Sequence, residues 1–305
     1  MKEINKKKTI FLNFFLLLLI GYHHYANAMI NIIAAENVYG NVAKELGGPF
    51  VNVVNILNNP AQDPHLFSIN PSTAKAVRYA NIIIMNGANY DPWMNSLLST
   101  TNDTKFDKKF YVIIISKLVP STDKKNPHLW YLPETMPIFS QQLVEQFILQ
   151  DPSHRQYYEE RLSQFNHDYQ VITHLIKQMK DQYRGTPVIA TEPLFNYMAQ
   201  SIGLKVYGEA FQLSVMNDLP PSISATREFE DYLRQHHVFL MFYNNQVVNQ
   251  STRHMISIAK EEKIPVIGMS EMMPNHITYV QWMKDQLLAV DHALAALAGS
   301  RYERK

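Results

Sequence analysis

A long helical pattern in the middle of the chain constrains the fold more than any other feature. No Gly or Pro occurs in residues 153–184. Asp151 followed by Pro152 is typical of a helix start, and Gly185 is typical of a helix end. Apolar residues recur along this segment at alternating spacings of four and three: Tyr158, Leu162, Phe165, Tyr169, Ile172, Ile176, Met179 and Tyr183.

About 30 residues rising 1.5 Å each make a rod of roughly 45 Å. We therefore expect residues 151–184 to form one rigid helix that links the parts of the chain on either side. The alternatives are a long helix packed on one part only, or a coiled-coil seam of about four heptads. The patterns that flank the segment favour the linking helix.

Short β-branched runs alternate with helical patterns on both sides of this helix, which predicts parallel sheets. We expect an α/β fold with two lobes, at residues 29–150 and 185–305, each holding a parallel four-stranded sheet. The predicted strands are 30–35, 51–57, 81–86 and 110–115, then 187–191, 204–207, 238–243 and 265–269. The predicted helices are 38–46, 71–80, 92–98 and 134–150, then 194–202, 224–236, 252–262 and 277–298, with 216–218 as a loop after Phe211-Gln212-Leu213.

The first 28 residues have the pattern of a signal peptide. Four Lys lie before an apolar run at residues 9–20, and Ala26-Asn27-Ala28 is a small-residue cleavage site. An apolar run of about a dozen residues is shorter than the roughly 20 that a membrane-spanning helix needs. We expect cleavage after Ala28; the alternative is an uncleaved anchor.

The charge balance argues against nucleic acid as a partner. The chain has 28 Lys and Arg against 27 Asp and Glu, a net charge of +1. Removal of residues 1–28 takes away four Lys and one Glu, which leaves 24 basic and 26 acidic residues and a net charge of −2. A protein this close to neutrality has no basic excess with which to displace counterions.

The chain contains no Cys, which limits both the chemistry it can carry out and the ways it can be anchored. Without Cys there is no disulfide, no thiolate ligand for a metal and no Cys at the cleavage site to carry a lipid. We therefore expect a free, soluble, monomeric protein in a periplasm.

Two histidines lie in segments that resemble each other. His65 lies in Asp-Pro-His-Leu-Phe, and His128 lies in Asn-Pro-His-Leu-Trp. Each follows a predicted strand of the first lobe, and ligands bind at strand ends in open α/β sheets. Neutral imidazole is a good ligand for first-row transition metals. The pair therefore indicates a metal site, although each His alone is also compatible with a turn in which the imidazole bonds to the backbone.

Two carboxylates follow predicted strands of the second lobe. Glu192 comes directly after strand 187–191, and Glu271 comes two residues after strand 265–269. A carboxylate at such a strand end either favours the start of the next helix or acts as an oxygen ligand. The pattern around each Glu leaves both roles open.

Taken together, these motifs resemble the metal-binding class of ABC-transporter solute-binding proteins, the zinc/manganese type called cluster A-I. Members show Asp-Pro-His and then Pro-His-hydrophobic-Trp, as at residues 63–65 and 127–130 here. Further matches are residues 71–87, Trp93, and Glu192 ahead of Phe-Asn-Tyr and Gly-Leu. The resemblance covers essentially the whole chain after the signal peptide. It implies two α/β lobes joined by one rigid helix, with the metal between the lobes.

The resemblance also implies a function and a set of ligands. The protein would capture a divalent transition metal, Zn2+ or Mn2+, as its transported ligand and deliver it to the membrane permease of an ABC importer, without catalysing a reaction. Ligand roles fall on His65, His128 and Glu192. Glu271 stands where family members often have Asp, and His276 or water are the alternatives for this fourth ligand.

Three departures from the family pattern bear on the metal. The third ligand is Glu instead of the His of many zinc members, the fourth is Glu instead of Asp, and residues 121–126 hold no His. Two His and two carboxylates form an oxygen-rich donor set that suits manganese or iron(II). Zinc nevertheless binds such donors more tightly than manganese does in the Irving–Williams order, so both metals stay open.

Two other functional classes compete with transport. A metal-dependent hydrolase would use the same His and Glu cluster, but the chain has neither a His-Glu-x-x-His helix nor a Gly-x-Ser-x-Gly elbow. An adhesin-like surface protein that binds metal is the other alternative, and the missing lipid-bearing Cys argues against anchoring at the surface.

The signal-peptide interpretation predicts the N-terminus of the exported protein. We expect N-terminal sequencing of periplasmic material to begin at Met29, or within a residue or two of it. A chain that begins at Met1, or one that carries a lipid at its terminus, would contradict the interpretation.

Overall fold

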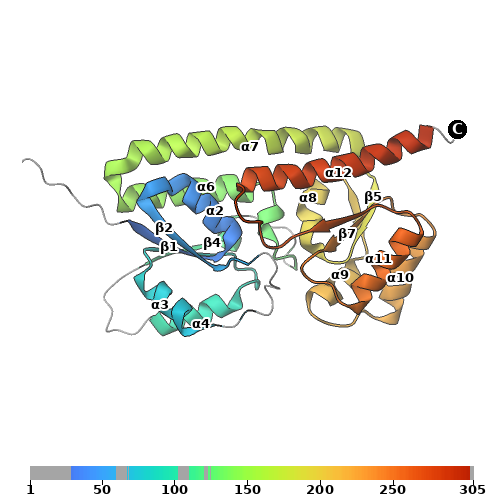
Figure 1. Ribbon diagram of the computed structural model, residues 1–305, viewed down its shortest axis with the longest axis horizontal. Helices are drawn as coiled ribbons and strands as arrows, with labels where there is room; N and C mark the ends of the chain where they lie inside the picture. The colour runs from blue at the N-terminus through green and yellow to red at the C-terminus, as the bar shows by residue number, and fades with distance from the viewer. Residues whose placement is uncertain are drawn as a thin grey trace, which may run out of the picture.

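The computed structural model describes residues 29–302, except 60–66, 68, 102–109, 120–122 and 124. The predicted signal peptide and His65 lie outside the described residues. Within them the chain forms two α/β lobes that lie side by side along one long helix, α7 (Figure 1). No helix among the described residues is long and apolar enough to cross a membrane.

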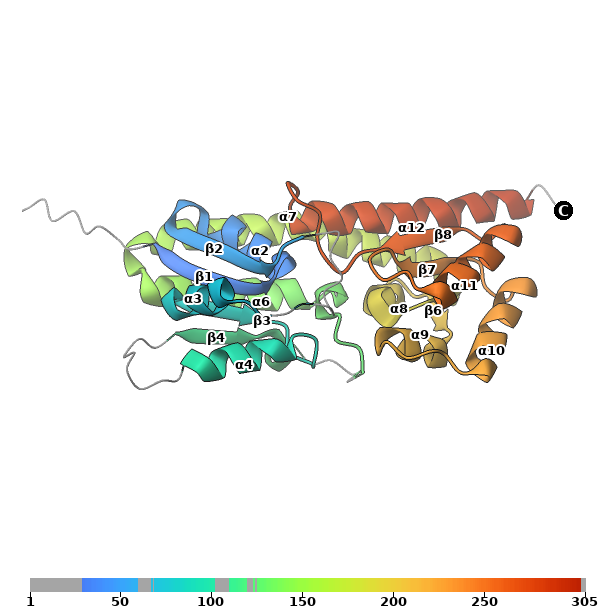
Figure 2. The same ribbon diagram turned by 60° about the horizontal axis from the view of Figure 1, so that its bottom comes forward.

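The first lobe is built on a parallel sheet with strand order β2-β1-β3-β4. Alternate residues of the central strand β1 face opposite layers of the core, so Ile32 packs with one set of helices and Ile33 with the other. Helices α2 and α6 cover one face of the sheet, and α3 and α4 cover the other (Figure 2). The elements are β1 (Ile30–Glu36), α2 (Asn37–Gly47), β2 (Val51–Leu57), α3 (Pro71–Tyr79), β3 (Ile82–Met85), α4 (Pro92–Thr101), β4 (Tyr111–Ile114), α5 (Ile115–Leu118) and α6 (Thr135–Gln150).

The second lobe repeats the arrangement, because its parallel sheet has the equivalent order β6-β5-β7-β8. Ile189 and Met241 face a core made with α9, α10 and α11, and Phe242 faces the opposite layer. The prediction of two lobes with parallel four-stranded sheets is confirmed. The elements are β5 (Pro187–Ala190), α8 (Asn196–Ser201), β6 (Lys205–Tyr207), α9 (Glu209–Met216), α10 (Ile223–Arg234), β7 (Met241–Asn244), α11 (Gln250–Glu261), β8 (Val266–Met269) and α12 (Tyr279–Tyr302).

The long helix α7 (Arg155–Tyr183) runs past both lobes, as the sequence predicts (Figure 1). Six of the eight residues in the predicted apolar stripe are buried, and the other two, Leu162 and Ile176, are partly buried against the core. The helix packs on α2 and α6 of the first lobe and on α12 of the second. It ends before Gly185, whose φ of 81° lies in the left-handed region that favours glycine.

The start of α7 differs in detail from the prediction. Residues Pro152–His154 form a 3-10 turn, and the α-helix begins at Arg155. The Asp151 carboxylate accepts hydrogen bonds from the side chains of Ser153, His154 and Tyr158 instead of from backbone N–H groups. Asp151 thus fastens the first turn through side chains, which explains why it is buried at a helix start.

Helix α9 was not predicted from the sequence. It begins after Gly208 at a φ of 87°, buries Phe211, Gln212 and Val215, and ends at Met216, so that only Asn217 and Asp218 of the predicted loop lie in a turn. The segment is short, and its mixed composition gives only two buried apolar residues at helical spacing. Tertiary contacts with α10, in which Phe211 packs against Phe229, stabilise a helix that the local pattern does not indicate.

The two lobes share one continuous apolar core. Tyr131 of the first lobe packs against Phe195 and Trp282 of the second, with ring centroids 5.2 Å and 5.7 Å apart. Tyr279 of α12 donates a hydrogen bond to the Trp130 carbonyl at 2.7 Å. Because a core that crosses the lobe boundary must be disrupted before the lobes separate, the structure supports a rigid arrangement.

This rigidity predicts a small change in shape on ligand binding. Small-angle scattering of metal-free and metal-loaded protein should give radii of gyration that differ little, because α7 and the shared core limit closure to a slight tilt. A large decrease in the radius of gyration on loading would show that the lobes move as independent bodies.

Candidate metal site

The carboxylates of Glu192 and Glu271 are buried close together at the carboxyl end of the second sheet. They follow β5 and β8, and their residues are only 2% and 1% exposed. The strand between them in the sheet is β7, which ends at the fully buried Asn244. The Asn244 amide nitrogen donates to Glu192 Oε2 at 3.1 Å and to Glu271 Oε1 at 2.5 Å. One neutral amide therefore bridges two carboxyl groups.

His128 of the first lobe faces this pair. Its ring is fully buried, and Nε2 lies 4.0 Å from Glu271 Oε2. Its Nδ1 lies 2.8 Å from Asn126 Oδ1, while the Asn126 amide nitrogen donates to the Pro193 carbonyl. Because the second contact orients the Asn126 oxygen toward His128, Nδ1 carries the proton and Nε2 presents its lone pair. This is how protein partners commonly orient a metal-binding imidazole.

Tyr90 closes the site on another side. Its hydroxyl donates to Glu271 Oε2 at 2.6 Å, and its ring packs edge-on against Trp130 at 4.9 Å between centroids. Burial raises the pKa of Tyr90 well above its usual value, and the charge of Glu271 raises it further. Tyr90 therefore keeps its proton and remains a hydrogen-bond donor to the carboxylate.

The segment that carries Glu271 is fixed by both lobes. Within the second lobe, Gln246 Oε1 accepts hydrogen bonds from the backbone N–H groups of Glu271 and Met272, at 2.6 Å and 2.9 Å. From the first lobe, the Asn37 amide donates to the Met273 carbonyl at 2.7 Å and accepts from the Met273 N–H at 3.1 Å.

Asn41, one helical turn further along α2, makes the same kind of pair. Its amide donates to the Ile277 carbonyl at 2.9 Å and accepts from the Tyr279 N–H at 3.0 Å. We call the bonds of Asn37 and Asn41 the α2 amide contacts. They hold the segment that follows β8 against the first lobe.

The structure describes three of the four predicted ligands, His128, Glu192 and Glu271. The structure brings His128 and Glu271 together, and Asn244 joins Glu192 to Glu271. His65 lies outside the described residues, and among the residues that are described no three His, Asp or Glu side chains form a group able to hold a metal. His276, the alternative to Glu271, is exposed, whereas Glu271 is buried.

Asn244, Tyr90 and Asn126 were not anticipated from the sequence. Each is a neutral polar residue in a segment that follows or ends a strand, where such residues are ordinary in turns. A signal was nevertheless present for Asn244. It follows predicted strand 238–243 directly, and all strands of a parallel sheet direct their carboxyl ends to one edge.

A second acidic pair lies at the end of the first sheet. Glu36 at the end of β1 and Asp91 are both about 1% exposed, and Asp91 accepts from the backbone N–H groups of Asn86 and Gly87. Burial raises the pKa of Glu36 well above its usual value, and the charge of Asp91 adds to this. Burial also raises the pKa of Asp91, and its hydrogen bonds from the backbone N–H groups of Asn86 and Gly87 partly offset this.

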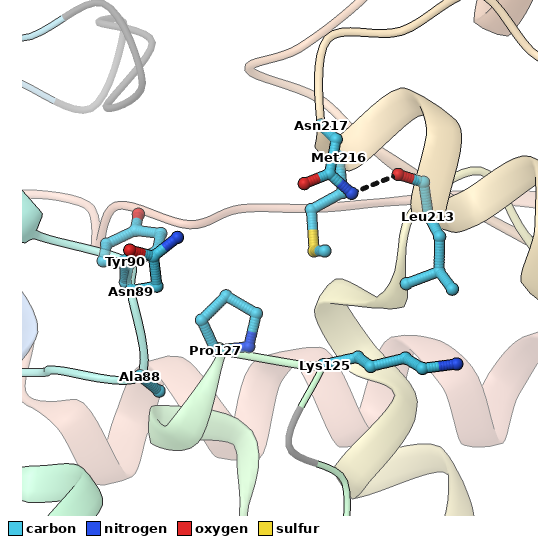
Figure 3. Close-up of a pocket in the computed structure, with 8 residues that line it drawn as sticks. All are labelled: Ala88, Asn89, Tyr90, Lys125, Pro127, Leu213, Met216 and Asn217. Atoms are coloured by element: carbon cyan, nitrogen blue, oxygen red, sulfur yellow. Dashed lines mark hydrogen bonds between the residues drawn. The ribbon is translucent and has the colours of Figure 1, made fainter.

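A pocket of about 420 Å³ opens between the lobes beside Tyr90. Figure 3 shows Tyr90 and Asn89 on one side, Leu213 on the other, and the Met216 side chain extending into the space between them. Pro127, next to His128, lines the pocket as well. At this rim Lys125 and Glu209 form an exposed ion pair across the lobes at 3.4 Å.

Comparison with known proteins gives consistent matches along the chain. A family model described as "Zinc-uptake complex component A periplasmic" matches residues 32–293. The manganese ABC transporter substrate-binding lipoprotein PsaA of Streptococcus anginosus is 22% identical over 251 residues, which cover 78% of each protein.

Solved structures show the same fold. The periplasmic zinc binding protein TroA of Treponema pallidum superposes with a TM-score of 0.70 at 16% identity, over 86% of this chain and 98% of that one. The Zn(II)-bound ZnuA-like domain of Streptococcus pneumoniae AdcA gives 0.67 at 17% identity, over 87% and 98%. The α/β fold of two lobes and a long helix is thereby shared with both.

The α2 amide contacts predict a stability effect far from the carboxylates in sequence. Asn37→Ala leaves the Met273 N–H and carbonyl without their partner in a buried position, so the free energy of unfolding should fall by about 1–3 kcal/mol. Asn52→Ala is the control, because Asn52 is exposed and its change should stay within about 0.5 kcal/mol. Equal effects of the two changes in urea unfolding would argue against the contacts.

Proposed function

The chain belongs to the family of periplasmic zinc-uptake complex A components, as its motifs indicate, and we propose that it captures a divalent transition metal between its lobes for an ABC importer. Components of this kind bind their substrate and catalyse no reaction, so the chain is not an enzyme. The metal would be zinc or manganese, which are the metals named for TroA and PsaA respectively.

The observation that carries this proposal is the contact of His128 with the buried Glu271 across the lobe boundary, where Asn244 joins Glu271 to the buried Glu192. Burying Glu192 and Glu271 at one place costs free energy, because neither charge is solvated and the two repel each other. A divalent cation bound there would compensate both charges. The imidazole of His128, oriented with Nε2 toward Glu271, adds a nitrogen donor.

We propose His65 as the remaining donor, so that two His from the first lobe and two Glu from the second bind the ion. Four protein donors leave no position for a reactive water, which suits storage and transfer of a metal and does not suit hydrolysis. Competition between zinc and manganese then depends on the donor set and on the supply of each metal in the cell.

The pocket beside Tyr90 supports an access route to this site. It lies between loops of the first lobe and the end of α9 in the second lobe, and Tyr90 connects it to Glu271 through their hydrogen bond. The ion pair of Lys125 and Glu209 at its rim is exposed to solvent and is therefore weak. We propose that the metal enters and leaves on this side.

The cellular setting is part of the same proposal. Residues 1–28 would direct export and be removed, and residues 29–150, 151–184 and 185–305 would act as first lobe, linking helix and second lobe. The monomer would work in the periplasm and present the metal to a membrane permease. Recovery of the mature chain on the surface of intact cells, and not in the periplasmic extract, would favour the adhesin-like alternative.

Replacing Glu271 tests its role as a ligand. Glu271→Ala removes an oxygen donor and a negative charge, so manganese affinity should fall more than zinc affinity, because the harder ion depends more on oxygen. Titration of the purified, metal-free variant with each ion measures both affinities. Glu159→Ala is the matched control, because Glu159 is an exposed acid on the long helix α7.

A purely structural role for Glu271 gives a different result. Stability would fall by about 0.5–2 kcal/mol, as for loss of a helix cap, and both affinities would be unchanged. That outcome would remove Glu271 from the ligand set.

Replacing His128 tests the site from the other lobe. His128→Ala should weaken binding of both metals by at least about tenfold, roughly 1.4 kcal/mol. It should also reduce the rise in melting temperature that excess metal causes in the wild-type protein by mass action. Thermal unfolding with and without zinc measures this, and an undiminished rise in the variant would contradict a ligand role.

A further inference from the structure

The orientation of Asn244 limits how the two carboxylates can meet a metal. Its Oδ1 accepts a hydrogen bond from the Gln246 N–H at 3.0 Å, which fixes the amide so that Nδ2 faces the carboxylates. Nδ2 then donates to Glu192 Oε2 and to Glu271 Oε1. One oxygen of each carboxylate is therefore engaged by the same buried amide.

The other oxygen of Glu271 faces the first lobe. Oε2 accepts from the Tyr90 hydroxyl at 2.6 Å and is the atom that lies 4.0 Å from His128 Nε2. A metal that binds His128 Nε2 would meet Glu271 at Oε2. Turning the carboxylate to offer both oxygens equally would move Oε1 away from the Asn244 amide and weaken that bond.

We propose that Asn244 is a positioning residue that holds Glu192 and Glu271 to one donor oxygen each and thereby favours zinc over manganese. The proposal rests on the proposed function, because it takes these carboxylates as metal ligands. The imidazole of His128 and two single oxygens leave one position in a four-donor set, which is the number that zinc prefers. Manganese prefers six donors, most of them oxygen, and would gain from carboxylates that bind through both atoms.

The position of Asn244 in the sheet explains why this one residue can control both ligands. It ends β7, the strand that lies between β5 and β8, so its side chain reaches both neighbouring strand ends. The amide is neutral, so it separates the two carboxylates without supplying a positive charge that would compete with the metal. Partners of this kind commonly change metal affinity by about 10- to 100-fold when they are replaced.

The test compares the ratio of manganese to zinc dissociation constants in wild-type protein, Asn244→Leu and the control Asn245→Leu. Asn244→Leu removes both N–H donors with little change in size, and Asn245 is an exposed amide that bonds Ser270 Oγ instead. We expect the zinc preference to fall on the order of tenfold in Asn244→Leu and to stay unchanged in Asn245→Leu. General effects on folding or on proton competition act on both metals and cancel in the ratio.

X-ray absorption of the zinc-loaded proteins supplies a readout that a merely structural role would not move. We expect four nitrogen or oxygen donors in the wild type and a higher number in Asn244→Leu. An unchanged ratio together with an unchanged donor number would overturn the inference while leaving the proposed function intact. Failure of the wild-type protein to bind either metal would instead overturn the proposed function.

A measurement on the wild type alone keeps the inference testable if Asn244→Leu does not fold. A crystal structure of the zinc-loaded wild-type protein should show each Glu bound through one oxygen, with the other still in hydrogen-bond contact with Asn244 Nδ2. Two-oxygen binding by either Glu, or loss of the contact with Asn244, would overturn the inference.

Discussion

The burial of two carboxyl groups side by side is the constraint on which the rest of the site depends. Glu192 and Glu271 are removed from water at neighbouring strand ends, where repulsion and lost hydration both oppose the ionised state. Asn244 places an amide between them, Tyr90 donates to one of them, and Gln246 fixes the backbone of Glu271. Such networks stabilise a fold only when their members find partners, which is why neutral donors surround these carboxylates.

The two lobes contribute different chemistry to the same place. The second lobe supplies the oxygen atoms, which the equivalent strand order of its sheet brings to one edge. The first lobe supplies the imidazole of His128 and an aromatic wall of Tyr90 and Trp130. Helix α7 and the core around Tyr131 fix the two lobes relative to each other. The site is therefore a product of the lobe arrangement and belongs to neither lobe alone.

The spacing of apolar residues was sufficient to predict the fold, because burial of one face of a helix or strand sets that spacing locally. Which face of a helix or strand is covered can be read from residues that are close together in the sequence. The apolar stripe of α7 and the β-branched runs of both sheets are examples. The short helix α9 escaped prediction because its stability comes from contacts with α10 and not from its own pattern.

The site shows the limit of sequence reasoning more clearly. His128, Glu192 and Glu271 belong to types that bind metals, so their positions after strands were informative. Asn244 ends a strand and Asn126 lies two residues before His128, but an amide in such a position has many ordinary uses. Its role here depends on partners that are 27 to 67 residues away in the chain. Whether His65 completes the ligand set remains a prediction.

The α2 amide contacts have a consequence for the order in which the protein folds. Asn37 bonds to Met273 across 236 residues, and Asn41 bonds to Tyr279 across 238. The first helix after the first strand cannot complete these bonds until almost the whole chain has been synthesised. Closing such long loops is entropically costly, and topologies rich in distant contacts fold slowly. For a chain that we expect to cross a membrane before it folds, this late step would prolong the unfolded state that export machinery requires.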